Sequence, residues 1–335
     1  MKAICFTEKG VAGLADMPLP VLAPGHALIR VKAGGLCHTD IDVLHGRYGE
    51  GRFPLVPGHE YAGLVESVAE DVTGLRPGAR VAVDPNLPCG TCNLCRKGLT
   101  NLCKELKAYG VTQDGGFAEY SIVKASHLHG IGDLPFDVAA LAEPLACVLN
   151  GLGNIGLTTG VRRAESALVF GGGPIGLLLA LSIRAQGVSN VVVADIDESR
   201  LSFARELGLE ALHPASPELE GRKRSFDLVA DATGVPTVVE SMPEFAQDGG
   251  AILVFGVCAP GVRVPISPFD IFRRQLTIAG SHSLNQNLPA ALDLLRKDNG
   301  TMARLISHRL PLKEVLPFFT KSGGAPTMKV QFVAE

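Results

Sequence analysis

The sequence predicts a two-domain α/β protein in which a β-rich part precedes a doubly wound parallel sheet. The chain has 335 residues, which is more than a single hydrophobic core usually serves. About the first 140 residues contain short alternating runs separated by Gly and Pro. From Ala167 onwards, short apolar runs alternate with helix-length segments, the pattern of parallel strands joined by crossover helices.

The composition is that of an ordinary globular protein, with 46% hydrophobic residues, 19% charged residues and a formal net charge of −3. This balance argues against binding of nucleic acid as the main function. The N-terminus has no signal-peptide pattern, so we expect a cytoplasmic protein. The uncharged run 166–183 approaches the length of a membrane span, but its Gly and Pro residues favour a strand, a turn and a helix.

The strands of the first part are predicted by alternation. From His26 to Ala33, every second residue is apolar, which is typical of a half-buried strand. Similar runs occupy residues 62–68, 80–83 and 117–123, and Pro-Gly or Gly-Gly pairs precede them and predict turns.

The second part alternates between the two kinds of element. The predicted strands lie at 167–170, 191–195, 226–231 and 251–256, and the predicted helices at about 174–186, 198–208 and 236–246. Such alternation indicates a parallel, doubly wound sheet. In about the last 45 residues, only a helix at 288–297 and a strand at 328–333 are predicted.

The segment GGGPIG fits the dinucleotide-binding pattern and lies between a predicted strand and a predicted helix. The segment is Gly171-Gly172-Gly173-Pro174-Ile175-Gly176, with the glycines of the pattern at 171, 173 and 176. The first glycine of the pattern permits a tight turn, the second admits the pyrophosphate, and the third lets the helix pack closely on the strand. Asp195, at the end of the next predicted strand, is placed to bind the adenosine ribose. Because this carboxylate repels a 2′-phosphate, we expect NAD rather than NADP.

Four of the eight cysteines lie in one short stretch, at Cys89, Cys92, Cys95 and Cys103. Four thiolates this close together can close a tetrahedron around one zinc ion, and such a site is structural because it has no open position. An iron–sulfur cluster has similar initial spacings, but no Pro follows the last cysteine. The clustering favours metal over disulfides in a chain without an export signal.

Further candidate ligands are scattered along the first half of the chain. Cys37 follows the first predicted strand, His59 and Glu60 lie in PGHEYAG, and Glu143 lies in the apolar segment AEPLAC. Taken singly, they are consistent with a core thiol, a surface histidine and a turn carboxylate.

Together, the motifs CHTD, PGHEYAG, CGTCNLC with its fourth cysteine, EPLAC and GGGPIG occur in an order that resembles the zinc-dependent medium-chain alcohol dehydrogenases. The resemblance covers nearly the whole chain. Within the family, EPL and the stretch DPNLPCGTCNLCRKGLTNLC are similar to the polyol branch, which includes sorbitol, galactitol and arabitol dehydrogenases.

The resemblance implies a chaperonin-10-like, β-rich catalytic domain formed by residues 1–150 and 286–335. A Rossmann domain that binds NAD, residues 151–285, would be inserted between these two segments. The segment 267–280 lies where relatives pair their nucleotide-binding domains, so we expect a homodimer or a homotetramer.

The resemblance also implies a catalytic zinc ion held by Cys37, His59 and Glu143, with Glu60 touching the ion or exchanging places with water. A carboxylate then replaces one thiolate of the Cys₂His site of alcohol dehydrogenase. Because oxygen releases less electron density than thiolate, we expect the zinc to remain a stronger Lewis acid. Cys147 is expected to line the nicotinamide site rather than to bind metal.

In the implied reaction, a secondary alcohol binds zinc, loses its proton and passes a hydride to NAD. Thr39 matches the family hydroxyl that takes the proton. Asp42 and His45 are alternative next carriers, and each is also consistent with a surface residue.

Further cofactor contacts are implied by the resemblance. They are Arg200 near the adenosine, Thr233 and Gly234 in DATG, Val257 in FGV, and Lys329 at the pyrophosphate.

The expected function is oxidation of a pentitol or hexitol to a ketose. The alternatives are an L-threonine or simple secondary-alcohol dehydrogenase of the same family, and a non-catalytic zinc-binding protein. The threonine branch typically has Asp-Pro-Phe where Glu143 precedes Pro-Leu, and the second ligand set argues against a non-catalytic protein. His282 and Ser283 stand where mammalian-type sorbitol dehydrogenases have an Arg, so a sorbitol preference does not carry over.

Overall fold

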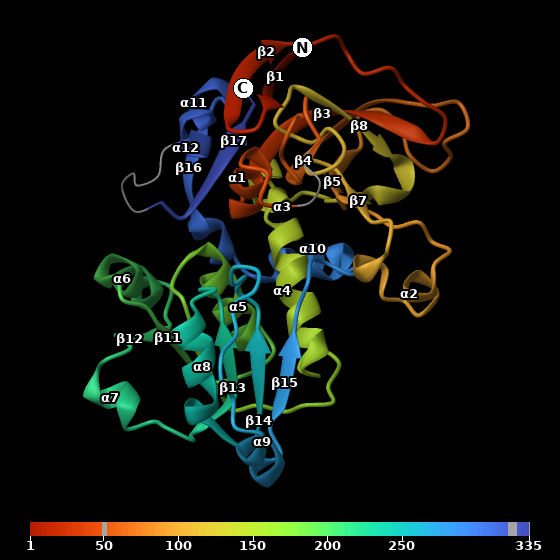
Figure 1. Cartoon of the computed structure of the whole chain (residues 1–335). Coiled ribbons are helices and arrows are strands. Elements are labelled where there is room, and N and C mark those ends of the chain that lie inside the picture. Colours follow the sequence, from red (N-terminus) through yellow and green to blue (C-terminus); the bar gives the residue numbers. More distant parts are fainter. Residues whose placement is uncertain (49–51, 321–326, 335) are drawn as a thin grey trace. The chain divides into compact units, whose positions relative to one another are not determined.

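The computed structural model describes residues 1–48, 52–320 and 327–334. The chain divides into two compact units, unit 1 (Met1–Ala146 with Leu284–Glu335) and unit 2 (Cys147–Ser283) (Figure 1). The first division falls inside helix α4 (Ala142–Asn154), and the second falls where the chain returns to unit 1.

Unit 1 is built around a seven-stranded sheet with the order β16-β17-β3-β4-β5-β9, in which β8 also pairs with β3. Its strands are β3 (His26–Gly35), β4 (Glu60–Val68), β5 (Arg80–Val83), β8 (Tyr120–Lys124), β9 (Leu128–Gly130), β16 (Ile306–Leu310) and β17 (Lys329–Val333). Strand β3 carries the predicted alternation and lies at the centre, because it pairs with β4, β8 and the C-terminal strand β17. Segments from the first 35 and the last 7 residues therefore contribute neighbouring strands to one sheet.

Shorter elements complete unit 1. The two small sheets are formed by β1 (Lys2–Glu8) with β2 (Val11–Asp16) and by β6 (Asn86–Leu87) with β7 (Lys107–Ala108). The helices and 3-10 turns are α1 (His38–Leu44), α2 (Asn93–Arg96), η1 (Thr100–Leu102), η2 (Ala125–His127), α3 (Phe136–Ala140), α10 (Leu288–Lys297), η3 (Met302–Leu305), α11 (Leu312–Val315) and α12 (Pro317–Thr320).

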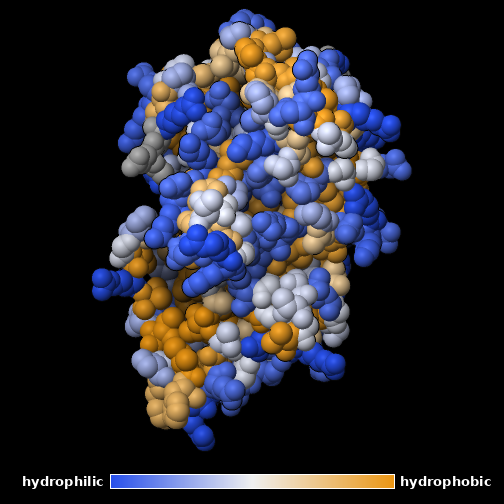
Figure 2. All heavy atoms as spheres, turned by 90° about the vertical axis from the view of Figure 1, so that its right-hand side faces the viewer, coloured by the Kyte–Doolittle hydropathy of each residue, from blue (hydrophilic) through white to orange (hydrophobic). Residues whose placement is uncertain are grey.

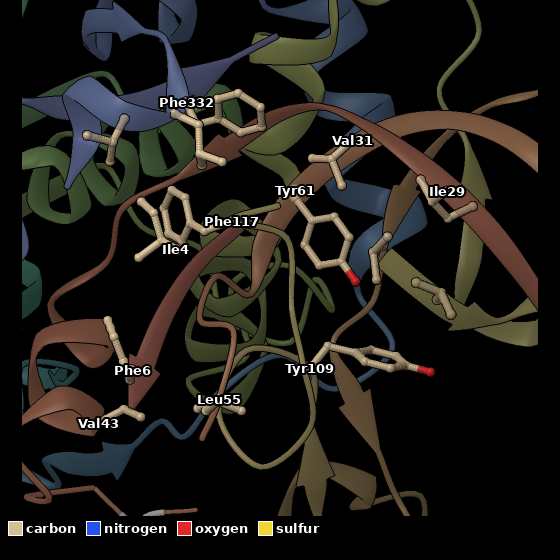
Figure 3. Packing of buried hydrophobic residues seen from close by; sticks show 14 of the residues in the cluster. Ile4, Phe6, Ile29, Val31, Val43, Leu55, Tyr61, Tyr109, Phe117 and Phe332 are labelled. Atoms are coloured by element: carbon tan, nitrogen blue, oxygen red, sulfur yellow. The ribbon is translucent and has the colours of Figure 1, made fainter. Parts of the chain in front are cut away.

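Aromatic side chains from distant parts of the chain form the core of unit 1 (Figure 3). The ring of Phe319 meets those of Phe6 and Phe117 edge to face, with centroids 5.4 and 5.2 Å apart. Tyr61 is fully buried, and its hydroxyl lies 3.0 Å from Ser121 Oγ, which satisfies its polar group. Burial of each such ring contributes about 1.5–3 kcal/mol. The contacts of Phe319 hold α12 against β1 and the segment before β8.

Unit 2 is a doubly wound sheet of six parallel strands with the order β12-β11-β10-β13-β14-β15. The strands are β10 (Ser166–Phe170), β11 (Asn190–Ala194), β12 (Glu210–Leu212), β13 (Phe226–Asp231), β14 (Ala246–Val254) and β15 (Thr277–Gly280). The helices are α5 (Pro174–Ala185), α6 (Glu198–Glu206), α7 (Pro217–Glu220), α8 (Pro236–Phe245) and α9 (Pro268–Arg274). The order reverses between β10 and β13, where ligands of such sheets bind at the carboxyl ends of the strands. The predicted fold class is confirmed.

The long uncharged run 166–183 forms β10, a glycine turn and α5, as its Gly and Pro residues predict. Among the described residues, one helical segment, Phe136–Asn154, is long and apolar enough to cross a membrane, but 78% of its apolar stretch is buried inside the protein. This segment therefore serves as a core helix.

Candidate functional site

The end of β3 and the start of β4 bring three potential metal ligands together. Cys37, His59 and Glu60 each offer one ligand atom, and these atoms lie within 4.8 Å of one another. Gly35 pairs with Glu60 across the two strands. A Cβ atom at Gly35 would lie 2.2 Å from Glu60 Oε2, so the glycine leaves the space that this carboxylate fills. The chain positions are distant, but the antiparallel pairing makes them neighbours.

Asp40 orients two members of this cluster, although the sequence analysis did not select it. Its side chain is fully buried. Asp40 Oδ1 lies 3.1 Å from His59 Nδ1, and Oδ2 accepts a hydrogen bond of 2.9 Å from the Cys37 amide. A carboxylate on one ring nitrogen leaves the other nitrogen to a metal ion and fixes the ring. Its position at the third residue of α1, after the helix-capping Cys37, is a signal that predicts the second contact.

The protonation of His59 is coupled to these neighbours. Burial lowers the pKa of the imidazole, but the negative charges of Asp40 and Cys37 outweigh this effect and raise the pKa well above its ordinary value. Protons therefore compete with a metal cation for this side chain.

Lys329 is also part of the cluster. Its buried ammonium donates hydrogen bonds of 2.7 Å to both oxygens of Glu60 and one of 3.2 Å to the Leu36 carbonyl. Burial lowers the pKa of Lys329, but the charge of Glu60 outweighs it, and the pKa is raised. The sequence analysis assigned Lys329 to the pyrophosphate. In the structure its charge is paired with Glu60, as a buried ammonium requires, and the contact with the pyrophosphate stays a prediction.

Glu143 and Thr39 lie in the helices near this cluster. Glu143 is buried in the first turn of α4, and its charge is among those that raise the pKa of Lys329. It is not one of the three residues whose ligand atoms lie within 4.8 Å. Thr39 is half-buried in α1, two residues after Cys37.

The two alternative proton carriers lie at the C-terminal end of α1. The Asp42 carboxylate is paired with Arg47 Nε at 2.8 Å and lies 3.8 Å from His38 Nε2. His45 caps the helix, with its amide donating to the Ile41 carbonyl.

The second metal-type cluster is the predicted cysteine tetrad, whose sulfur atoms all lie within 4.8 Å of one another. Backbone amides donate to these sulfurs: Cys89 N lies 3.2 Å from Cys103 Sγ, and Cys92 N lies 3.4 Å from Cys89 Sγ. Hydrogen bonds from the Cys95 and Lys104 amides lower the pKa of Cys92 to about 6. The pKa of Cys95 is raised to about 12 by desolvation and by its bond to Cys92. A metal cation competes with protons for these sulfur atoms, so binding of the cation releases protons.

In unit 2, the glycine motif lies where the pattern predicted, between β10 and α5. Gly171 has a φ of +105°, which favours glycine. A Cβ atom at Gly176 would lie 1.8 Å from the Gly171 carbonyl oxygen, so the third glycine permits the close packing of helix and turn. Pro174 begins α5 and Ile175 follows it, while Gly173 caps the helix.

Asp195 stands directly after β11. Its Oδ2 accepts a hydrogen bond of 2.6 Å from the Gly172 amide, which joins the acidic residue to the glycine turn. Arg200 lies beside it, with NH1 3.6 Å from Asp195 Oδ2. Thr233 follows β13, and Val257, which follows β14, is 89% exposed. These residues come from the carboxyl ends of neighbouring strands, where a dinucleotide binds.

Family profiles match both units. The profile of the alcohol dehydrogenase GroES-like domain matches residues 23–133, and that of the zinc-binding dehydrogenase matches residues 174–297. D-altritol 5-dehydrogenase of Agrobacterium fabrum (strain C58) is 62% identical over 336 residues, which cover 100% of both chains. L-threonine 3-dehydrogenase of Shewanella baltica (strain OS155) is 31% identical over 285 residues, 82% of this chain and 81% of the relative.

A solved structure supports the same grouping. A chain described as a zinc-binding dehydrogenase from Sinorhizobium meliloti 1021, bound to NADP, superposes with a TM-score of 0.93 at 32% identity, and the match covers 99% of each chain. Together with the full-length relative and the two family profiles, this match shows that the chain belongs to the zinc-binding dehydrogenases of the alcohol dehydrogenase family.

Proposed function

We propose that the protein oxidises D-altritol, or a hexitol of similar configuration, to a ketose with NAD as the acceptor. The observation that supports this substrate is the 62% identity to D-altritol 5-dehydrogenase over the whole length of both chains. The L-threonine enzyme, the alternative within the family, shares only 31% over a shorter match. We propose that oxidation occurs at carbon 5, as the name of the altritol relative states.

Unit 1 acts as the catalytic domain in this proposal. Cys37, His59 and Glu143 would hold the catalytic zinc, since a thiolate, an imidazole and a carboxylate are all accepted zinc ligands. When bound, zinc would act as a Lewis acid on the substrate hydroxyl. Asp40 supports this assignment, because it holds the His59 ring by Nδ1 and leaves Nε2 to a cation.

Glu60 would stand beside the ligands rather than among them. Both of its oxygens accept hydrogen bonds of 2.7 Å from Lys329, and the two side chains are only 1% and 5% exposed. A buried ion pair of this kind keeps a neutral environment next to the metal ligands.

The Thr39 hydroxyl would take the proton of the substrate hydroxyl and pass its own proton on towards Asp42 or His45.

The cysteine tetrad would hold the second, structural zinc. Its four sulfur atoms lie within 4.8 Å of one another, and four thiolates leave no position for a substrate. This second ion would stabilise the loop that contains α2 and η1.

Unit 2 acts as the cofactor domain. The glycine turn would hold the pyrophosphate, and Asp195 would bind the adenosine ribose hydroxyls. Arg200, Thr233 and Val257 would line the same edge. NAD is preferred in this proposal because the Asp195 carboxylate repels a 2′-phosphate. Four of the eight cysteines are gathered in the proposed zinc site, which supports a reducing compartment such as the cytoplasm.

The edge of the sheet in unit 2 suggests how copies of the chain would associate. Strand β15 is one of the two edge strands of this sheet, and Ile278 on it is exposed. Helix α9, before it, exposes Phe269 and Phe272 by 68% and 79%. Figure 2 shows apolar residues gathered at the lower end of the view, where Figure 1 places α9. We propose a homodimer in which the β15 edges of two copies pair.

The substrate proposal predicts a ranking among alcohols. With NAD and the purified enzyme, D-altritol should give the highest kcat/KM, other hexitols and pentitols lower values, and L-threonine no turnover. NADP in place of NAD should lower kcat/KM, because of the charge of Asp195. The formation of NADH or NADPH measures both. Turnover of L-threonine together with no turnover of any polyol would overturn the assignment.

The metal assignment predicts that substitutions at Glu143 and Cys147, which lie one turn apart on α4, differ in their effect on the zinc content. The wild-type protein should carry two zinc ions per chain, and Glu143→Ala should carry one, because it removes a ligand of the catalytic ion. Cys147→Val should keep both ions. The loss of kcat/KM in Glu143→Ala should exceed the roughly 10- to 100-fold typical of residues that only orient a ligand. Elemental analysis of the dialysed proteins measures the zinc, and two ions in Glu143→Ala would contradict the ligand set.

The dimer proposal predicts that Ile278→Asp converts the protein to a monomer, because a charge on the paired edge is costly. The control is Leu19→Asp, an equally polar change at an exposed apolar residue of unit 1. Light scattering on the eluting peak of a sizing column gives the mass of each protein. A wild-type monomer, or a dimer that persists in Ile278→Asp, would count against this interface.

A further inference from the structure

We infer that Asp231 is a positioning residue that holds three loops of the cofactor edge of unit 2 in one arrangement. The inference rests on the proposed binding of NAD to this edge. Asp231 ends β13, which lies between β10 and β14 in the sheet, and its side chain is 0% exposed. The proposed reaction gives this buried carboxylate no task of its own.

The carboxylate first shapes the loop between β13 and α8. Asp231 Oδ1 accepts hydrogen bonds from Thr233 N at 2.8 Å and from Thr233 Oγ1 at 2.5 Å. Asp231 Oδ2 accepts one from Gly234 N at 3.1 Å. The Thr233 hydroxyl in turn accepts a hydrogen bond of 3.0 Å from the Val235 amide. Three successive residues after Ala232 are therefore fixed, directly or through one hydroxyl, by Asp231.

The same residue holds the loop that follows β14. The Asp231 carbonyl accepts hydrogen bonds from Gly256 N at 2.9 Å and from Phe255 N at 3.2 Å. A Cβ atom at Gly256 would lie 2.3 Å from Gly234 N and 2.5 Å from Asp231 Oδ2. A Cβ atom at Gly234, whose φ is +67°, would lie 2.4 Å from the Val257 carbonyl oxygen. The backbones of the two loops are therefore in contact directly beside the carboxylate. This contact includes the backbone of Val257 and so positions its exposed side chain.

The third loop is the glycine turn after β10. Ala232 N donates a hydrogen bond of 2.8 Å to the Phe170 carbonyl, immediately before the turn. A Cβ atom at Gly171 would lie 3.1 Å from Thr233 Cγ2. Asp231 holds the hydroxyl of Thr233, and the methyl group of the same side chain therefore lies against Gly171, the first glycine of the turn. Displacement of Thr233 would disturb the pyrophosphate loop and the Val257 loop together.

A carboxylate suits this place better than any other side chain of its size. Each of its oxygens accepts at least one hydrogen bond from the loop, and a carboxylate offers acceptors only. The amide of an asparagine would turn an N–H group towards an N–H group of Thr233 or Gly234. One buried donor would then lack an acceptor, and the loop would have to shift.

The test compares Asp231→Asn with Asp227→Asn in the full-length, zinc-loaded protein. Asp227 lies at the other end of the same strand, and its carboxylate also accepts from backbone amides, Glu165 N at 2.9 Å and Ser166 N at 3.0 Å. Both variants remove the same charge from β13. The readouts are the Kd of NADH from its fluorescence, the KM of NAD, kcat, the KM of the alcohol, and the Tm without cofactor.

Asp231→Asn should raise the Kd of NADH and the KM of NAD by roughly 10-fold, the size of one lost hydrogen bond to a charged group. Its kcat and its KM for the alcohol should stay within about 2-fold of wild type, because the metal ligands lie in unit 1. Both variants should lower Tm, and by similar amounts. Asp227→Asn should nevertheless leave the Kd of NADH unchanged. The inference is overturned if Asp231→Asn binds NADH like wild type, or if both variants weaken NADH equally.

A second variant decides the matter if Asp231→Asn does not fold. Gly256→Ala keeps the carboxylate but puts a Cβ atom where Gly234 N and Asp231 Oδ2 lie. It should weaken NADH by a similar factor, and an unchanged Kd would count against the inference. Failure of the wild-type protein to bind NADH would overturn the proposed function, whereas wild-type binding with unaffected variants overturns only the role of Asp231.

Discussion

The antiparallel pairing of Gly35 with Glu60 brings the end of β3 and the start of β4 together, and the chemistry of unit 1 depends on it. Cys37 follows one partner by two residues, and His59 directly precedes the other. The absence of a side chain at Gly35 gives the Glu60 carboxylate its place, 2.2 Å from where a Cβ atom would be. Since β3 also pairs with β8 and β17, the position of the cluster is fixed by the most connected strand of the sheet.

Buried charges in this region are paired with one another, and this pairing links separate parts of the chain. Asp40 is shared between the Cys37 amide and the His59 ring, while Glu60 is paired with Lys329. A buried charge without a partner is strongly unfavourable, so each residue constrains the next. Strand β17 is therefore joined to the cluster by an ion pair in addition to its backbone pairing with β3. In unit 2, the buried Asp231 likewise joins the loops that follow three strands.

The local motifs were predictable because their spacing alone determines their geometry. The glycine turn and the cysteine tetrad each lie within one short segment, so the sequence predicted both and placed Asp195 beside the turn. Strand β3 and helix α10 followed from their periodicity. Asp40 lies only three residues after Cys37, but its contact with His59, 19 residues further along the chain, has no local pattern that predicts it.

Long-range pairs were not predictable from residue patterns. The ion pair of Lys329 with Glu60 joins residues 269 apart in the chain, and no local pattern links them. The proximity of Glu143 in α4 to Lys329 and the joining of two loops at Asp231 likewise arise from the packing of elements distant in sequence. Resemblance to a family supplied the ligand set, whereas the side chains that support the ligands became visible only in the structure.

The zinc content of two adjacent glycine variants tests the central role of the β3–β4 pairing most directly. In Gly35→Ala, the new methyl group would overlap Glu60 Oε2, whereas the nearest atom to a Cβ at Gly34 lies 3.6 Å away. Because His59 directly precedes Glu60, displacement of Glu60 should move this zinc ligand. Elemental analysis after dialysis should therefore find about one zinc per chain in Gly35→Ala, the ion of the cysteine tetrad, and two in Gly34→Ala. Two tightly held ions in Gly35→Ala would contradict the account, because the pairing would then not set the geometry of the ligands.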